Sequence, residues 1–339
     1  MQMTDRSRST SASAGITLTA AVAPIVWGST YVVTTELLPA DHPMTASVLR
    51  ALPAGLLLLA LRPGVPPRGW RLRTFVLGML NIGCFFPLLF VAADRLPGGL
   101  AAIVGALQPL VVVALTLALR WGRPAITHVA WGVVALVGVA LVSLSGGAVF
   151  NVHGFGAAVL GTVSMALGLL LTRRWGTPEG TRPLTSTAWQ LIVGGVVIAP
   201  LIPIVDSGPW QPTAAGYAGY AWLTLVGGAL AYSAWFRGAR ALPSARIALL
   251  GVLSPLTAAV LGWVVLGQAL SPLQIVGFVV ALLGSLGGQL GQAGSRGPSS
   301  ESLSRRSSRV SPGRRSRARS TGTAADRPTG TATTPRRCR

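Results

Sequence analysis

The sequence contains no lysine, and only 8 of its 339 residues are acidic. A chain without lysine cannot form a phosphate-binding loop that ends in Gly-Lys-Ser/Thr, which excludes this way of binding ATP. The acidic residues are scattered along the chain, so a membrane-embedded catalytic cluster is not indicated. The two cysteines are Cys84, in an apolar run, and Cys338, next to the C-terminus, and they predict neither a disulfide framework nor a paired thiol metal site.

Histidine is scarce as well. His42, His128 and His153 lie far apart in the sequence, each near the end of an apolar segment. A metal site needs several ligands that converge on one ion, and this spacing does not predict such a site. We therefore expect no metal and no cofactor.

Apolar residues are abundant: 51% of the chain is hydrophobic, 11% is charged and the mean hydropathy is +0.59. A bilayer core about 30 Å thick requires roughly 20 apolar residues in a helix. Alternating strand segments of the kind found in membrane barrels are absent. The sequence predicts an all-α integral membrane protein with ten transmembrane helices, near residues 16–38, 43–61, 72–92, 98–119, 125–145, 153–172, 184–205, 213–236, 243–266 and 271–290.

All 28 basic residues are arginine, and their positions indicate the orientation in the membrane. Basic residues collect in the loops on the cytoplasmic side. If the N-terminus is inside, the outer connectors carry only Arg95. We therefore expect a multi-pass protein of the inner (cytoplasmic) membrane with both termini in the cytoplasm. The inner connectors would hold Arg62, Arg68, Arg71, Arg73, Arg120, Arg123, Arg173, Arg174, Arg182, Arg237 and Arg240.

An internal repeat appears when the sequence is shifted by 146 positions. Residues 93–115, "ADRLPGGLAAIVGALQPLVVVAL", then align with residues 239–261, "ARALPSARIALLGVLSPLTAAVL". Chance similarity between two Leu/Val/Ala-rich segments is the alternative, but prolines and glycines recur in fixed register. Each repeat would hold five helices, and an odd number places the second copy upside down in the membrane. The predicted segments are an N-terminal cytoplasmic stretch (1–15), two five-helix repeats (16–145 and 153–290) and a tail (292–339).

These features resemble the EamA family of the drug/metabolite transporter superfamily. The residues that carry the resemblance are Trp27-Gly28-Ser29, Arg50, "LPGGLAAIVGALQPL", "LPSARIALLGVLSPLTAAVLGWVVLGQALS", Gly277 and Gly284. Members often have a Gly-Glu pair after the fourth and ninth helices, whereas this chain has Gly122-Arg123 and Gly267-Gln268. The resemblance implies the export or uptake of small metabolites, such as amino acids or related compounds, without ATP.

The expected function is therefore that of a secondary transporter, and in particular an exporter. Inverted repeats recur in secondary transporters, where the seam between the halves forms a site that opens to either side in turn. A passive channel or facilitator and a membrane-embedded enzyme are the alternatives. The chain is not expected to be an enzyme, because its acids and histidines do not cluster.

Polar residues within the apolar windows are the candidate substrate site. In the first helix Trp27, Ser29 and Tyr31 accompany a polar stripe at helical spacing. Gln108 and Ser254 occupy equivalent positions in the repeat, each just before a proline that frees a backbone carbonyl. Ordinary helix packing is the competing interpretation of these small and polar side chains. The other candidates for the cavity are Arg50, Asn81, Trp189, Gln190, Trp222 and Tyr232.

Arg50 is the charged residue expected deepest within a span, where a charge costs between about 2.5 and more than 10 kcal/mol. Glu36 is expected near the outer end of the first helix, so a salt bridge between them is feasible. Functionally, Arg50 would contact an anionic group of the substrate or form a gate with Glu36. The structural alternative is a bridge without a transport role, or snorkelling to the surface.

The tail, residues 292–339, is rich in Ser, Thr, Gly, Pro and Arg, so we expect it to be disordered. Its arginines would be drawn to anionic lipid headgroups. Nucleic acid is not an expected partner, because no aromatic residues alternate with the arginines. Gly284 and Gly288 form a small-xxx-small pair that indicates close packing within one chain, or else a weak homodimer.

Overall fold

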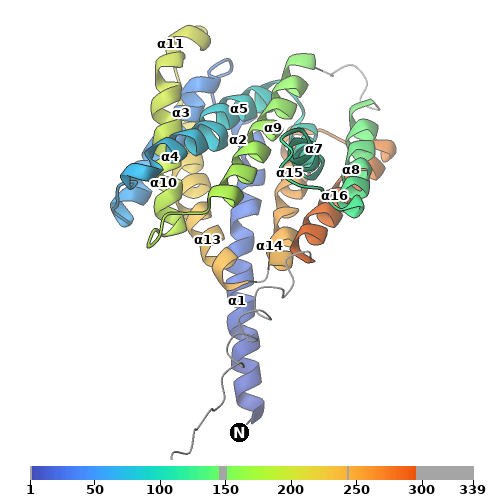
Figure 1. The fold of residues 1–339 in the computed structure, drawn as a ribbon. Helices are drawn as coiled ribbons and strands as arrows, with labels where there is room; N and C mark the ends of the chain where they lie inside the picture. The colour runs from blue at the N-terminus through green and yellow to red at the C-terminus, as the bar shows by residue number, and fades with distance from the viewer. Residues whose placement is uncertain (1, 145–150, 243, 295–339) are drawn as a thin grey trace, which may run out of the picture. The chain divides into compact units, whose positions relative to one another are not determined.

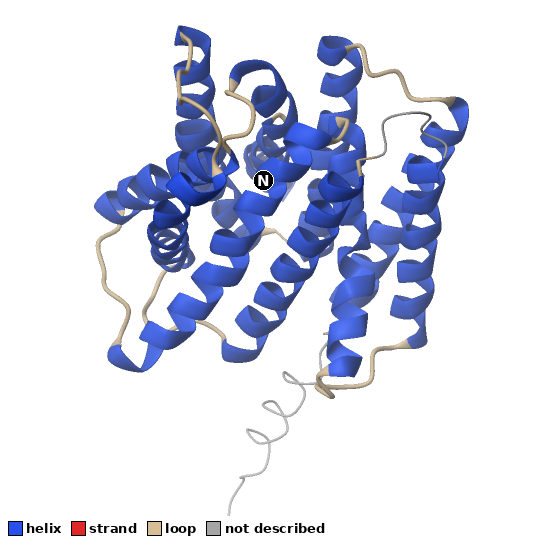
Figure 2. Cartoon of the chain, turned by 90° about the horizontal axis from the view of Figure 1, so that it is seen from above, coloured by secondary structure: helices blue, strands red, loops and turns tan. Residues whose placement is uncertain are grey.

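The computed structural model describes residues 2–144, 151–242 and 244–294, and all regular structure in these residues is helical (Figures 1 and 2). Most of the predicted tail, residues 295–339, lies outside the described residues. The α-helices are α1 (Gln2–Gly28), α2 (Thr30–Leu37), α3 (Pro43–Leu61), α4 (Arg71–Gly78), α5 (Phe85–Arg95), α6 (Gly98–Val104), α7 (Gln108–Ala118), α8 (Ile126–Leu144), α9 (Val152–Trp175), α10 (Pro183–Ile198), α11 (Ile202–Val205), α12 (Ala214–Ala221), α13 (Ala231–Ala241), α14 (Ser244–Gly251), α15 (Leu253–Leu266) and α16 (Pro272–Gly294). Shorter or irregular helical turns join them: η1 (Arg68–Trp70), η2 (Met79–Cys84), η3 (Gly105–Leu107), η4 (Ala199–Leu201) and η5 (Trp222–Leu230).

Nine helical segments of the described chain are long and apolar enough to cross a membrane, which makes this a multi-pass membrane protein. The window predicted at 213–236 is not among them. It is nevertheless helical throughout, as α12, η5 and α13 in succession. Its tyrosines and glycines lower its mean hydropathy below that of the other spans. The nine spans are Gly15–Leu37, Pro43–Leu61, Arg68–Arg95, Gly98–Ala118, Ile126–Ser143, Val152–Trp175, Pro183–Val205, Leu249–Leu266 and Pro272–Leu290.

The first span is one helix with a local break. α1 begins at Gln2, well before the predicted start of the span at residue 16, and it ends at Gly28. At the break, the backbone N–H of Ser29 is shared between the carbonyls of Ile25 (3.3 Å) and Val26 (3.1 Å). Pro24 lies inside α1 and has no N–H to donate. The chain direction can therefore change between α1 and α2 without exposing many backbone groups.

Four pairs of helices pack most extensively on each other. They are α8 with α16, α3 with α10, α5 with α9 and α1 with α13. In Figure 1, α8 and α16 lie side by side at one edge of the helical unit. Glycine permits this close approach: a β-carbon on Gly138 would collide with the backbone of Ala281, and one on Gly284 would collide with the backbone of Ala135.

Two π-helical stretches, η2 and η5, interrupt the third span and the α12–α13 segment. A π-helical turn misaligns backbone hydrogen bonds and is frequent at functional sites. In both stretches a side chain from another helix binds a backbone carbonyl. The Ser164 hydroxyl donates to the carbonyl of Leu80 (2.7 Å), and the Trp27 indole donates to the carbonyl of Gly227 (3.0 Å). These bonds join the irregular turns to α9 and α1.

Candidate functional site

Arg50, on α3, is the central residue of the candidate site. Its side chain is 4% exposed, and its Nη1 donates a hydrogen bond to the hydroxyl of Thr30 (3.1 Å). The guanidinium carbon lies 4.9 Å from the ring centre of Phe86 and 5.9 Å from that of Phe90, both on α5. Cation–π contacts of this kind partly replace the water that a buried cation loses. Nε of Arg50 has no hydrogen-bond partner among the described residues.

Among the described residues Glu36 and Arg50 form no ion pair, so the gate between them stays a prediction. Glu36 is exposed, and the ion pair found in the described residues joins Arg95 to Asp41 instead. Helix geometry explains the difference, because Thr30 and Thr34 share the buried face of α2. Glu36 follows Thr34 by two residues, which is more than half a turn around the helix, so its side chain leaves that face.

Four of the predicted site residues gather where α1 meets η5 and α13. The ring of Trp27 lies 5.4 Å from that of Tyr232 and 5.5 Å from that of Trp235. The indole of Trp222 donates to the hydroxyl of Ser29 (2.9 Å). Tyr232 also packs against the core cluster that includes Ala51 and Phe86, and Tyr31 directly follows Thr30, so both tyrosines adjoin the Arg50 site.

Asn81 and Gln190 form a second polar contact, between η2 and α10. The Asn81 amide donates to Oε1 of Gln190 at 2.8 Å, and Nε2 of Gln190 lies 3.5 Å from the hydroxyl of Ser186. The Asn81 side chain also occupies the space beside Gly168, where any β-carbon would collide with it. This half-buried amide pair bridges the two halves of the sequence.

The three remaining predicted residues are Trp189, Gln108 and Ser254. Trp189 is buried and donates to the carbonyl of Gly64 (2.8 Å), so it anchors the connector that follows α3. No hydrogen bond within the described residues joins Gln108 to Ser254. Gln108 is half-buried at the start of α7, whereas the backbone of Ser254 is packed against Gly28.

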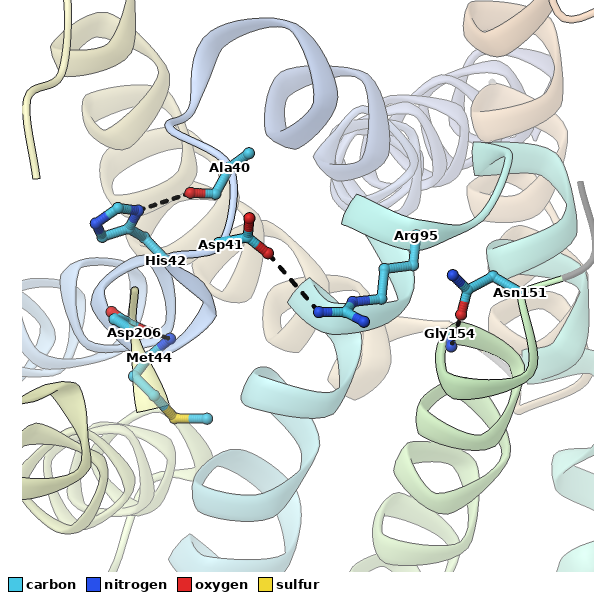
Figure 3. Close-up of polar contacts among 8 residues, drawn as sticks. All are labelled: Ala40, Asp41, His42, Met44, Arg95, Asn151, Gly154 and Asp206. Carbon is cyan, nitrogen blue, oxygen red and sulfur yellow. Dashed lines mark hydrogen bonds and ion pairs between the residues drawn. The ribbon is translucent and has the colours of Figure 1, made fainter. Parts of the chain in front are cut away.

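A small pocket of about 30 Å³, roughly the room that one water molecule takes, lies at the other end of α2. Figure 3 shows the polar contacts beside it: Arg95 faces Asp41 (3.7 Å), and Nδ1 of His42 lies 2.7 Å from the carbonyl of Ala40. The residues that line the pocket are Thr34, Leu38, Pro39, Asp41, His42, Pro43, Ala46, Phe90, Val91, Asp94 and Arg95.

Asp206 holds the N-terminus of α3 next to this pocket (Figure 3). Its two carboxylate oxygens accept the backbone N–H groups of Met44 (2.9 Å) and Thr45 (2.8 Å), and Oδ2 also accepts the Thr45 hydroxyl (2.7 Å). A carboxylate is favourable at a helix N-terminus because the unpaired N–H groups and the helix dipole are positive there. Sequence reasoning missed Asp206, Phe86 and Phe90, because no local pattern tells which helix will face Arg50 or the start of α3.

A metal site requires several ligands that converge on one ion. Among the described residues, no three His, Cys, Asp or Glu side chains converge closely enough to hold one. The chemistry available at the candidate site is therefore that of one guanidinium, aromatic rings, amides and hydroxyls. Such groups can bind and orient a small molecule.

Comparison with known proteins gives consistent results. The protein from Dickeya dadantii (strain 3937) named Protein PecM is 47% identical over 257 residues, which cover 76% of this chain and 86% of that protein. A probable terminal-alkyne amino-acid exporter of Streptantibioticus cattleyicolor is 28% identical over 243 residues, covering 70% of this chain and 76% of the exporter. A crystal structure with 20% identity superposes with a TM-score of 0.58 over 84% of this chain and 99% of that one, which supports the fold alone.

The family model for EamA-like transporters matches the chain twice, at residues 14–144 and 153–287. The two matches leave out only the chain ends and a short connector, and together they span most of the described helices. The resemblance predicted from the sequence is thereby confirmed. The chain belongs to the EamA-like transporter family.

Proposed function

We propose that the protein is a secondary transporter that exports small metabolites, such as amino acids or related compounds, by alternating access. It would consist of ten membrane-spanning helices in two inverted five-helix repeats, residues 16–145 and 153–290. The Ala214–Ala241 segment supplies the tenth helix. Both chain termini would face the cytoplasm of the inner membrane, and the protein would act as a monomer or a weak homodimer.

Reciprocal packing between the halves is the observation that carries this proposal. Gly138 packs on Ala281, and Gly284 packs on Ala135. The sequence repeat has a shift of 146 positions. With this shift Gly138 corresponds to Gly284 and Ala135 to Ala281, so the second contact is the first contact with the two halves exchanged. An exchange of this form is what a two-fold axis between repeats produces. Gly287 on Trp131 and Gly277 on Leu141 form another such exchange.

The pair α3 and α10 repeats the pattern with a shift of 140. Gly55 packs on Ile192, and Gly195 packs on Leu52. With this shift, Arg50 of the first half corresponds to Gln190 of the second half. The two polar residues at the seam are therefore equivalent positions, as expected where inverted halves form one substrate site. Trp27, Ser29, Tyr31, Asn81, Trp222 and Tyr232 are proposed to line it, with Gln108, Trp189 and Ser254 as further candidates.

The exporter of Streptantibioticus cattleyicolor is a relative whose name refers to amino-acid export, and this supports the proposed direction and substrate class. A passive channel is the second candidate, because a polar seam between the halves could also let solutes diffuse through at a rate that does not saturate with concentration. A membrane enzyme is disfavoured, since the groups at the seam include no general base with an activated nucleophile.

Growth assays and reconstitution together test the proposal. Cells that overproduce the protein should resist one or more members of a panel of toxic amino-acid analogues, compared with cells that carry an empty vector. The protecting compound should then show saturable counterflow in proteoliposomes, and Gln190→Leu should reduce that counterflow, whereas Gly156→Ala, with open space around it, should not. Linear flux without counterflow would support the channel instead.

A further inference from the structure

Arg50 has no acidic counterpart in the described part of the protein. Asp41 pairs with Arg95, Asp206 accepts hydrogen bonds from the backbone at the start of α3, and Glu36 is exposed. A buried charge without an opposite charge is costly in a protein interior and more so within a bilayer. The acidic residues between positions 16 and 290 are Glu36, Asp41, Asp94, Glu179 and Asp206, and none forms an ion pair with Arg50.

The free edge of the guanidinium has a defined shape. Thr30 accepts a hydrogen bond from Nη1, while Nε makes none and no described residue binds Nη2. Nε–H and Nη2–H lie parallel on one side of the planar group, which is the fork that binds both oxygens of a carboxylate. The rings of Phe86 and Phe90 flank the group and hold it in place. Arg50 is thus preorganised for a planar anion rather than for a single oxygen.

The small pocket lies one helical turn from the Arg50 site. Three of its lining residues are Thr34, Ala46 and Phe90. Each lies four residues from a member of the Arg50 site on the same helix, namely Thr30, Arg50 and Phe86. Residues four apart stack on one helix face about one turn, or roughly 5–6 Å, from each other. The Arg50 site therefore forms the layer directly beneath the pocket floor.

The two halves differ at this point in charge. Arg50 corresponds to Gln190 by the 140-residue shift, and Gln190 is bonded to the neutral Asn81. The pathway would thus carry one fixed cation at Arg50 and neutral amides at the equivalent place in the other half. Such an arrangement favours an anionic group at one end of a bound molecule.

We propose that Arg50 binds the carboxylate of the transported molecule through its Nε–Nη2 edge, so that the substrates are small organic carboxylates with an apolar or aromatic part. This inference rests on the proposed function and specifies its substrate class. The aromatic cluster of Trp27, Tyr232 and Trp235 would receive the apolar part. Binding neutralises the buried charge, which gives the carboxylate its selectivity over neutral analogues of equal shape.

Thermal unfolding of the full-length protein in detergent at fixed ionic strength tests the inference. The probes are benzoate with benzamide and L-leucine with L-leucinamide, because each pair differs in the carboxylate. At least one acid should raise the midpoint by about 2–4 °C in a saturable way, while its amide should not. Arg50→Gln should abolish the rise, and Arg68→Gln, which removes an exposed arginine that does not line the pocket, should retain it.

If Arg50→Gln cannot be purified folded, Arg50→Lys decides the question, because it keeps the charge and loses the planar fork. Its response to the acid should fall by at least half, and a response equal to that of the wild type would overturn the inference. Equal responses to acid and amide, or no response to either acid, would overturn it as well. If a neutral compound shows counterflow that persists in the Arg50→Gln variant, the carboxylate inference is refuted and the transporter proposal stands. If an acid binds but no compound shows counterflow, the transporter proposal fails and the carboxylate inference stands.

Discussion

Gly138 in α8 packs directly on the backbone of Ala281 in α16, and no room for a β-carbon remains between them. The reciprocal contact, Gly284 on Ala135, lies in the same pair of helices. Lipid gives little hydrophobic drive for helix association, so close backbone approach between small residues contributes much of the contact energy. The seam between α8 and α16 is accordingly tight, and substrate access is better sought between the other helices.

Replacing Gly138 with alanine should destabilise the protein. The added methyl group would meet the backbone of Ala281, which cannot rotate away as a side chain can. Overpacking of this kind costs about 1–3 kcal/mol. Thermal unfolding in detergent should show a lower midpoint for Gly138→Ala, and also for Gly284→Ala. Gly156→Ala is the matched control, because this helical glycine has open space around it. An unchanged midpoint for both seam variants would contradict the packing described.

Asp206 should contribute to stability through the start of α3. Asp206→Asn keeps the size of the side chain and removes the negative charge that faces the N–H groups of Met44 and Thr45. A lost cap interaction costs about 1 kcal/mol. The unfolding midpoint in detergent should therefore fall. Glu36→Gln removes a charge from an exposed side chain and should have little effect. If both variants lower the midpoint equally, the loss reflects net charge rather than the cap.

Asn81 and Gln190 should show energetic coupling. Each single change to leucine leaves one half-buried amide without its partner, whereas the double change removes both polar groups. Double-mutant cycles in membrane proteins give about 0.6 kcal/mol on average and up to about 1.7 kcal/mol. Unfolding of the two single variants and the double variant in mixed micelles measures this term. Strictly additive effects would indicate that the two amides do not interact in the folded protein.

The helix windows were predictable from the sequence because twenty apolar residues are a local property. The edges differ where local rules do not apply: α1 continues to Gln2 through polar residues, and the Ala214–Ala241 segment is helical without standing among the nine apolar spans. The π-helical stretches η2 and η5 could not be predicted, since their backbone carbonyls are bound by Ser164 and Trp27 from distant parts of the chain.

The candidate site shows the same division between local and tertiary information. Arg50 was identifiable as a charge within an apolar window, but its partners were not. The sequence suggested Glu36 as the partner of Arg50. In the structure the partner is Thr30, because Thr30 lies on the buried face of α2 and Glu36 does not. Trp189 was expected at the cavity, yet its indole reaches the carbonyl of Gly64 because the connector after α3 folds back over α10.

Labelling of single cysteines should reveal the inverted arrangement. Residues 65 and 207 follow α3 and α11, which end equivalent spans in the two halves, so an inverted repeat puts them on opposite faces of the membrane. Val65 and Ser207 are both exposed. The backbone N–H of Ser207 donates to the carbonyl of Asp41 (3.2 Å), so the connector before α3 lies on the same face as residue 207. In a chain with Cys84 and Cys338 replaced by alanine, a membrane-impermeant maleimide should label Ser207→Cys and Ala40→Cys in intact cells. Val65→Cys should react only after permeabilisation. Labelling of all three from outside would place the two connectors on one face, and two parallel halves cannot form a seam that opens to each side in turn.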